Sequence, residues 1–230
     1  MPTRRAILTT AGAAAVVGLA GAAGAAGYAW WPGQASARAP WSAAGESLGD
    51  PRLDALAYAI LAPNPHNRQP WLFELQGEDR IDVFCDLDKR LPHTDPSDRQ
   101  ITIGFGCMLE LLRQAAAEKG HDLRLDLFPD GEGGPRLGEG RIASVVFQSG
   151  AAAREPLFAH ALNRRSNKEP FEERALEAGA LKAVIDAAGV EGAGATQEAE
   201  QVARLIDICW RAWMIEYELD ATRKESIDLM

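Results

Sequence analysis

The chain has 230 residues, of which 47% are hydrophobic and 25% charged, so it can form one globular domain or two small ones. Its formal net charge is −9 at pH 7, and because such a surface repels phosphate groups, nucleic acid is excluded as an expected partner. Cys85, Cys107 and Cys209 are odd in number and far apart, so the sequence predicts no disulfide framework and no metal site, and we expect three buried thiols.

Residues 1–37 have the layout of an export signal. Arg4 and Arg5 precede an uncharged stretch rich in alanine and glycine, and small residues at 35–37 suit a signal peptidase. The arginine pair resembles a twin-arginine signal, which predicts export to the periplasm or the cell exterior. That route carries folded, often cofactor-loaded proteins, so it favours a bound prosthetic group. The alternative is a permanent membrane anchor formed by residues 6–31, which are long enough to span a bilayer.

A linker at 38–49 is followed by a predicted helix and a predicted β-hairpin. The helix is expected over 51–62, with Asp50 as its N-cap, because apolar residues recur there at helical spacing. The prolines of the next stretch exclude helix and favour extended chain or a turn. Alternating apolar residues then predict strands at 71–75 and 80–88, joined by a tight turn.

The rest of the chain predicts helices and two further strands. A long helix is expected over 97–119, stopped by Gly120, with Gly104 and Gly106 allowing close packing. The other predicted elements are strands at 121–128 and 141–149 around a glycine-rich loop at 130–140, and helices near 154–163, 172–188 and 196–228. The loop lacks the glycine spacing of a nucleotide cradle. This order of elements predicts an α+β fold.

The last predicted helix is amphipathic and is still running at Met230, with no glycine, proline or polar tail to end it. We therefore expect the chain to stop inside a domain. Part of the surface that covers this helix would then be missing, or be supplied by a partner chain.

Two polar motifs are candidates for a ligand site. The first, "PNPHNRQPW" at 63–71, combines rigid prolines with amide side chains that both donate and accept hydrogen bonds. The second, "RRSNKEPF" at 164–171, offers guanidinium and ammonium groups that suit phosphate. By residue type alone the second motif is more typical of a solvated helix end. Trp71 is expected in the core and His66 in a turn or on the surface.

Together these motifs resemble those of the nitroreductase family of flavoproteins. The first is similar to the family signature P-S-x-x-N-x-Q-P-W through Pro63, Asn67, Gln69, Pro70 and Trp71, with Asn64 where serine is usual. The second is similar to the phosphate-gripping motif R-x-S-x-K/R through Arg164, Ser166 and Lys168. The two motifs occur in the reverse of the usual order. This order, the export signal and "HTDPSDRQ" resemble the Acg-like branch, in which two nitroreductase halves are fused in one chain.

The resemblance implies a nitroreductase-like α+β fold with an antiparallel or mixed sheet flanked by helices. The chain would be an incomplete fused pseudo-dimer, with a first half at 50–150 and the start of a second half at 151–230. It implies FMN as the cofactor and assigns catalysis to no side chain. The expected cofactor-binding residues are Pro63, Asn64, Pro65, Asn67, Gln69, Arg164, Ser166 and Lys168. A further basic residue for the phosphate is implied, and the carboxy-terminal region offers no candidate.

The implied activity is electron transfer from NAD(P)H or another reduced donor, through FMN, to a nitroaromatic or quinone-like acceptor. Two alternatives stay open. The first is an FMN-binding or FMN-sequestering protein with little turnover, which the scarcity of reduced nicotinamide outside the cytoplasm favours. The other alternative is a truncated product that binds nothing well.

Overall fold

The computed structural model describes residues 39–131, 134–150, 152–167, 169–172, 174–177 and 179–229. The chain forms two compact units that divide between Arg165 and Ser166. The predicted export or anchor segment lies outside the described residues. Within the described ranges, no helix is both long enough and apolar enough to cross a membrane.

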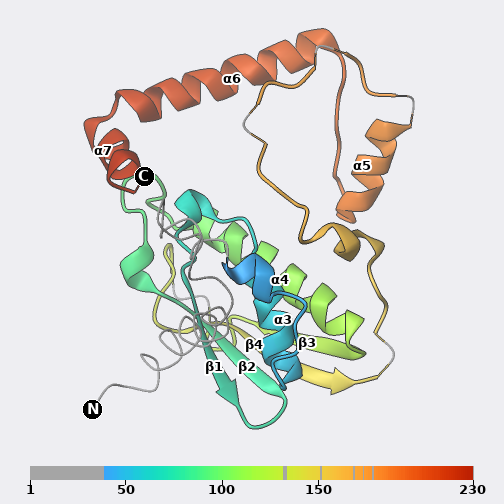
Figure 1. The fold of residues 1–230 in the computed structure, drawn as a ribbon. Coiled ribbons are helices and arrows are strands. Elements are labelled where there is room, and N and C mark those ends of the chain that lie inside the picture. The colour runs from blue at the N-terminus through green and yellow to red at the C-terminus, as the bar shows by residue number, and fades with distance from the viewer. Residues whose placement is uncertain are drawn as a thin grey trace, which may run out of the picture. The chain divides into compact units, whose positions relative to one another are not determined.

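The first unit contains a four-stranded antiparallel sheet and two main helices (Figure 1). Its elements are α3 (Pro51–Ala59), η1 (Pro65–Asn67), β1 (Trp71–Gln76), β2 (Arg80–Cys85), η2 (Leu87–Lys89), α4 (Arg99–Glu118), β3 (His121–Leu127), β4 (Arg141–Ser149) and η3 (Pro156–His160). The strands follow the spatial order β1-β2-β4-β3. The α+β prediction and the predicted hairpin are therefore confirmed, and the sheet is antiparallel.

The start of α3 follows from its capping residues. The Asp50 carboxylate accepts a hydrogen bond from the Arg52 backbone N–H at 2.9 Å, as predicted for an N-cap. The buried Arg52 guanidinium pairs with Asp50 at 2.7 Å and donates to the Gly77 carbonyl at 2.9 Å. This arginine therefore ties the start of α3 to the turn of the β1–β2 hairpin.

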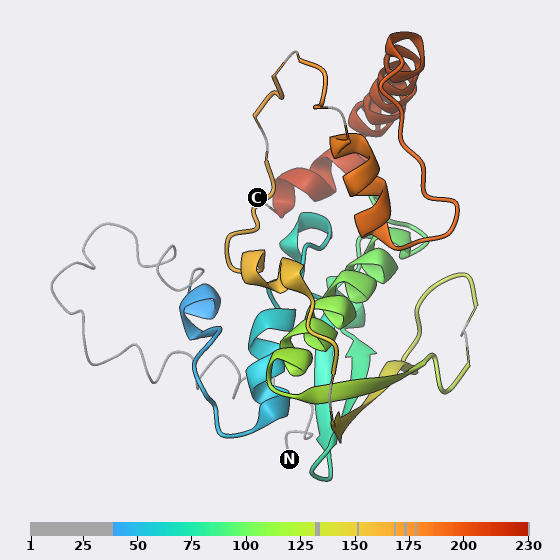
Figure 2. The ribbon, with the colours of Figure 1, turned by 90° about the vertical axis from the view of Figure 1, so that its right-hand side faces the viewer.

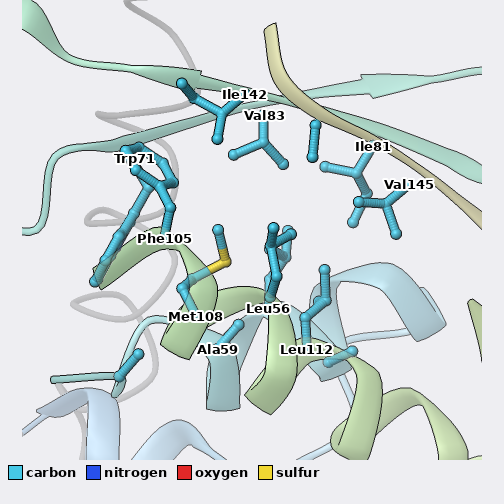
Figure 3. Close-up of a cluster of buried hydrophobic side chains, with 14 of the residues drawn as sticks. Leu56, Ala59, Trp71, Ile81, Val83, Phe105, Met108, Leu112, Ile142 and Val145 are labelled. Carbon is cyan, nitrogen blue, oxygen red and sulfur yellow. The ribbon is translucent and has the colours of Figure 1, made fainter. Parts of the chain in front are cut away.

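One face of the sheet carries the core. The register pairs Phe73 with Val83 and Ile81 with Val145, so the apolar side chains of these strands share one face. The register shifts between Val83 and Phe84, which leaves Ile142 as an extra residue of β4. Figure 3 shows that Ile142 also faces the core.

Helices α3 and α4 cover this face and lie side by side (Figure 2). Leu56 of α3 and Phe105, Met108 and Leu112 of α4 point toward the sheet (Figure 3). Trp71 is buried, and its ring packs on that of Phe105 in a T-shaped arrangement with centroids 6.1 Å apart. The prediction that Trp71 belongs to the core is confirmed.

Several predicted boundaries are wrong. The predicted helix at 51–62 ends at Ala59, and the predicted strand at 80–88 ends at Cys85, where the chain turns into η2. The helix expected near 154–163 is only the short η3, which begins at Pro156. Short helical segments need tertiary packing to persist, and periodicity alone does not supply it.

The second unit contains α5 (Ala180–Ala188), α6 (Ala199–Glu218) and α7 (Asp220–Asp228). The helix predicted over 172–188 begins only after Gly179, whose φ of 90° is left-handed. The helix predicted over 196–228 is broken at Leu219, which is extended. The Thr222 hydroxyl donates to the Leu219 carbonyl at 2.9 Å and so satisfies a carbonyl at the break.

Helix α6 carries an exposed apolar and aromatic face. Trp210, Trp213 and Tyr217 stack in a row, with successive ring centroids 5.2 Å apart. Cys209 is exposed on the same helix, whereas Cys85 is buried and Cys107 is half-buried. The prediction of three buried thiols is therefore confirmed for Cys85, met in part for Cys107 and wrong for Cys209. A periodic apolar pattern does not ensure that a helix face is covered.

Candidate functional site

The loop between α3 and β1 has an unusual backbone. His66, Asn67 and Gln69 have φ values of 49°, 50° and 49°, in the left-handed region that non-glycine residues seldom adopt. Each such residue costs on the order of 1 kcal/mol or more, and asparagine tolerates the conformation better than most. Three of them within four positions persist only because neighbouring groups hold them, and such concentrated strain supports a functional role.

Amide side chains hold this loop from within. The Asn64 Oδ1 atom accepts the Gln69 backbone N–H at 2.7 Å, and its Nδ2 atom donates to the Ala62 carbonyl at 3.2 Å. The Gln69 Nε2 atom donates to the Ile60 carbonyl at 3.3 Å. Asn64 and Gln69 therefore shape the loop, while Pro63 and Asn67 are exposed on it.

The loop also packs closely on α4. A Cβ atom at Gly104 would lie 3.3 Å from the Asn64 Cβ atom and 3.7 Å from the Pro63 carbonyl oxygen. The prediction that Gly104 allows close packing is confirmed. It is wrong for Gly106, where a Cβ atom would meet nothing within 4 Å in the described part of the chain.

Arg164 brings the start of the second motif to the chain just before the first. Its Nη2 atom donates to the Leu61 carbonyl at 3.0 Å, across 103 positions of sequence. The chain around it is anchored in the first unit, since Leu162 packs against the small apolar cluster that includes Leu61, and the Arg165 guanidinium lies over the Trp41 ring at 5.2 Å. Arg164 is half-buried, and its fork retains other donors.

The structure does not test the other two expected residues of the second motif. Ser166 is exposed at the start of the second unit, and Lys168 lies outside the described residues. Between them, the Asn167 side-chain oxygen accepts the Glu169 backbone N–H at 3.1 Å, which is a local turn. His66 is exposed in its turn, as predicted.

Two basic residues were missed by the sequence analysis, Arg68 in the loop and Lys89 beside it. Arg68 donates to the carbonyls of Asp88 and Lys89, and the Lys89 ammonium donates to the Gln69 carbonyl at 3.3 Å. The pairing of Trp71 with Cys85 was the available signal, because a hairpin register places the residues after β2 beside those before β1. With Arg164, these side chains place three cationic groups in or beside the loop.

The stretch "HTDPSDRQ" forms a buried carboxylate cluster at the start of α4. Asp95 accepts the backbone N–H groups of Gln100 at 3.1 Å and Ile101 at 2.9 Å, so it caps the helix. Asp98 is 0% exposed and lies 3.0 Å from the Arg136 guanidinium. The Arg90 Nε atom lies 3.1 Å from Asp98 Oδ2, an ion pair whose geometry does not make a hydrogen bond.

These charged residues cap α4 and pair with one another. Across the described residues, no group of histidine, cysteine and acidic side chains could hold a metal ion. The candidate site is the loop at 63–70 together with Arg164, which offers cations, the exposed Pro63 and the exposed Asn67 amide to a ligand.

Comparison with known proteins gives partial matches. No family model matches the chain. The chain is 34% identical over 76 residues to a protein of Mycobacterium tuberculosis (strain ATCC 25618 / H37Rv) named "Putative NAD(P)H nitroreductase acg", a match covering 33% of this chain and 23% of that relative. It is 32% identical over 75 residues to "Putative NAD(P)H nitroreductase Rv3131" of the same strain, covering 33% of this chain and 22% of that relative.

Both matches thus span less than a quarter of the relative's length. They make this chain a distant, partial homologue of proteins named as nitroreductases, and its α+β architecture is compatible with such a fold.

Proposed function

We propose that the chain is an FMN-binding oxidoreductase of the nitroreductase type. Electrons would pass from NAD(P)H or another reduced donor to a nitroaromatic or quinone-like acceptor. The observation that carries this proposal is the hydrogen bond from Arg164 to the Leu61 carbonyl, because it brings the first residue of the second motif to the chain two residues before the first motif, across 103 positions of sequence. The partial homology to proteins named as nitroreductases supports it.

The chemistry of the loop fits the proposed cofactor. FMN presents a phosphate dianion, a polar ribityl chain and a ring edge with donors and acceptors. The Arg164 guanidinium can spare donors for the phosphate, and we propose that Ser166 and Lys168 add a hydroxyl and a second cation. The exposed Asn67 amide can both donate and accept, and Pro63 and Pro65 keep the nearby backbone rigid.

FMN, when bound, supplies the redox chemistry. The chain's own residues would bind and orient it and hold positive charge nearby. This division of labour requires no catalytic side chain.

The first test is the visible absorption spectrum of the purified protein, before and after denaturation and after incubation with FMN. Release of FMN from yellow protein supports the proposal. We expect Arg164→Ala to weaken FMN binding about 10- to 100-fold, as the loss of a charge-assisted contact would. Arg154→Ala is the control, since it removes an exposed guanidinium 3.8 Å from Glu118, and we expect it to have little effect. Colourless protein that takes up no added FMN would overturn the proposal.

Turnover is a separate measurement. Steady oxidation of NADH or NADPH by the FMN-loaded protein, with an added nitroaromatic or quinone, would support the enzyme. Retained FMN that neither nicotinamide reduces would instead identify an FMN-binding or FMN-sequestering protein.

We also propose that the protein is exported by the twin-arginine route, with residues 6–31 either removed or kept as an anchor. Replacement of Arg4 and Arg5 by lysine is expected to block export, which fractionation of producing cells would reveal. Finally, we propose that another polypeptide surface covers the exposed apolar face of α6. The molar mass of the full chain in solution tests whether a partner chain is needed.

A further inference from the structure

The loop that carries the proposed site rests against the segment that follows β2. The hairpin register pairs Trp71 with Cys85 and so brings residues 86–90 beside residues 66–70. The Asp86 backbone N–H donates to the Pro70 carbonyl at 2.6 Å, which extends this pairing beyond the strands. The loop is therefore supported from a second part of the chain.

Two cationic side chains cross between these segments. The Arg68 guanidinium donates to the carbonyl of Lys89 from Nε and to that of Asp88 from Nη2, each at 3.2 Å. In return, the Lys89 ammonium donates to the Gln69 carbonyl at 3.3 Å. Each side chain thus bonds the backbone beside the other, and neither is paired with a carboxylate in these contacts.

Gln69 needs this support more than its neighbours do. Its φ of 49° is left-handed, and it precedes Pro70, where the proline ring favours an extended residue. Asn64 holds its backbone N–H at 2.7 Å, and Lys89 holds its carbonyl. Of these two bonds, that of Lys89 is the one made from outside the loop.

The supporting segment is itself anchored. Arg90, adjacent to Lys89, forms the ion pair with the fully buried Asp98 at the start of α4. A chain of contacts therefore runs from the start of α4, through residues 89 and 90, to the left-handed Gln69.

We propose that Lys89 is a positioning residue for the cofactor loop, acting through the Gln69 carbonyl to hold the left-handed turn between Asn64 and Pro70. The expected consequence, tighter FMN binding, rests on the proposed function. The positioning itself concerns only the loop, so it can be measured in the flavin-free protein. Arg68 shares the role, because its side chain lies on the loop and donates to the backbone of residues 88 and 89.

The first measurement is amide hydrogen exchange of Gln69 in the flavin-free full chain. We expect Lys89→Met to speed this exchange about tenfold, with the midpoint of thermal unfolding little changed, and Lys89→Arg to restore slow exchange. Lys119→Met is the matched control, since it also removes one ammonium group from the first unit, at a residue 3.8 Å from Asp54. Unchanged Gln69 exchange in Lys89→Met would overturn the positioning role.

The second measurement is FMN affinity in the same variants. We expect Lys89→Met to weaken FMN binding about tenfold, Lys89→Arg to recover most of it, and Lys119→Met to leave it within about twofold. In the double variant with Arg68→Met, the losses should fall short of the product of the single losses, because both side chains support one contact. Fully independent losses would overturn the shared role.

The two proposals fail separately. Faster Gln69 exchange in Lys89→Met, combined with a wild-type chain that binds no FMN, would overturn the proposed function and support the positioning. A fall in the unfolding midpoint with uniformly faster exchange across α3, α4 and the sheet would overturn the positioning role, since Lys89 would then stabilise the whole unit.

Discussion

Helices α4 and α6 show how the same local pattern leads to different outcomes in the two units. Both are 20 residues long and amphipathic. On α4, Ile101, Phe105 and Met108 are at most 1% exposed, whereas on α6, Trp210 and Trp213 are 59% and 50% exposed. Periodicity determined that both segments are helical, and only α4 found a sheet and a second helix to cover its apolar face.

The difference extends to the whole of each unit. Among the described residues, every buried hydrophobic side chain lies between Ala44 and Phe147. Of the residues described in the second unit, only the polar Thr222 is buried. A hydrophobic core therefore stabilises the first unit, and the described part of the second unit shows no such core.

Thiol labelling should give the largest contrast between the units. Burial raises the pKa of Cys85 to about 12, so its thiol stays protonated at pH 8, whereas Cys209 is exposed. In a Cys107→Ala variant, which leaves one thiol in each unit, we expect Cys209 to react with an aromatic disulfide at least about a thousandfold faster than Cys85, which must wait for unfolding. Equal rates at pH 8 would contradict the buried position of Cys85.

Truncation of a large side chain should separate the units next. Phe105→Ala removes a buried ring between α4 and the sheet, and we expect a loss of about 3 to 5 kcal/mol in the free energy of unfolding. Trp213→Ala, on the exposed face of α6, should change it by less than about 0.5 kcal/mol. Urea unfolding followed by circular dichroism measures both. A comparable loss in the two variants would show that the α6 face is packed in solution.

Loss of a carboxylate should have a smaller effect that again depends on burial. Asp98→Asn removes the buried charge that pairs with Arg90 and Arg136, and because both arginines are partly solvated we expect a loss of about 2 kcal/mol in the free energy of unfolding. Asp207→Asn breaks an exposed pair with Arg211 at 3.0 Å and is expected to cost about 0.3 kcal/mol. The midpoints of urea unfolding compare the two, and a neutral Asp98→Asn would remove the anchor inferred for residues 89 and 90.

Two glycines on α4 should give the smallest and sharpest difference. Gly106→Ala meets open space and is expected to stabilise the helix by up to about 1 kcal/mol. Gly104→Ala would press on Asn64 and is expected to destabilise by about 1 kcal/mol and to disturb the loop. Thermal unfolding and FMN titration report the two effects. Equal stabilisation by both variants would show that the loop yields freely at Asn64.

Much of the first unit could be predicted because its signals are local. The Asp50 cap, the alternating apolar residues of the hairpin and the periodicity of α4 each act within a few residues, and the structure confirms the elements they predict. The wrong boundaries lie where local signals are weak. Periodicity in 172–179 gave no helix before Gly179, because a helical pattern without a packing surface is only marginally stable.

For the candidate site, the sequence by itself determined which chemical groups are present: prolines and amides in one motif, arginines in another. Only the tertiary structure decided how they are used. The amides of Asn64 and Gln69 bond within the loop, Arg164 reaches Leu61 across 103 positions, and Lys89 reaches Gln69 across 20. The Lys89 contact follows from the hairpin register, whereas the Arg164 contact depends on how distant segments pack, which their separation in sequence does not indicate.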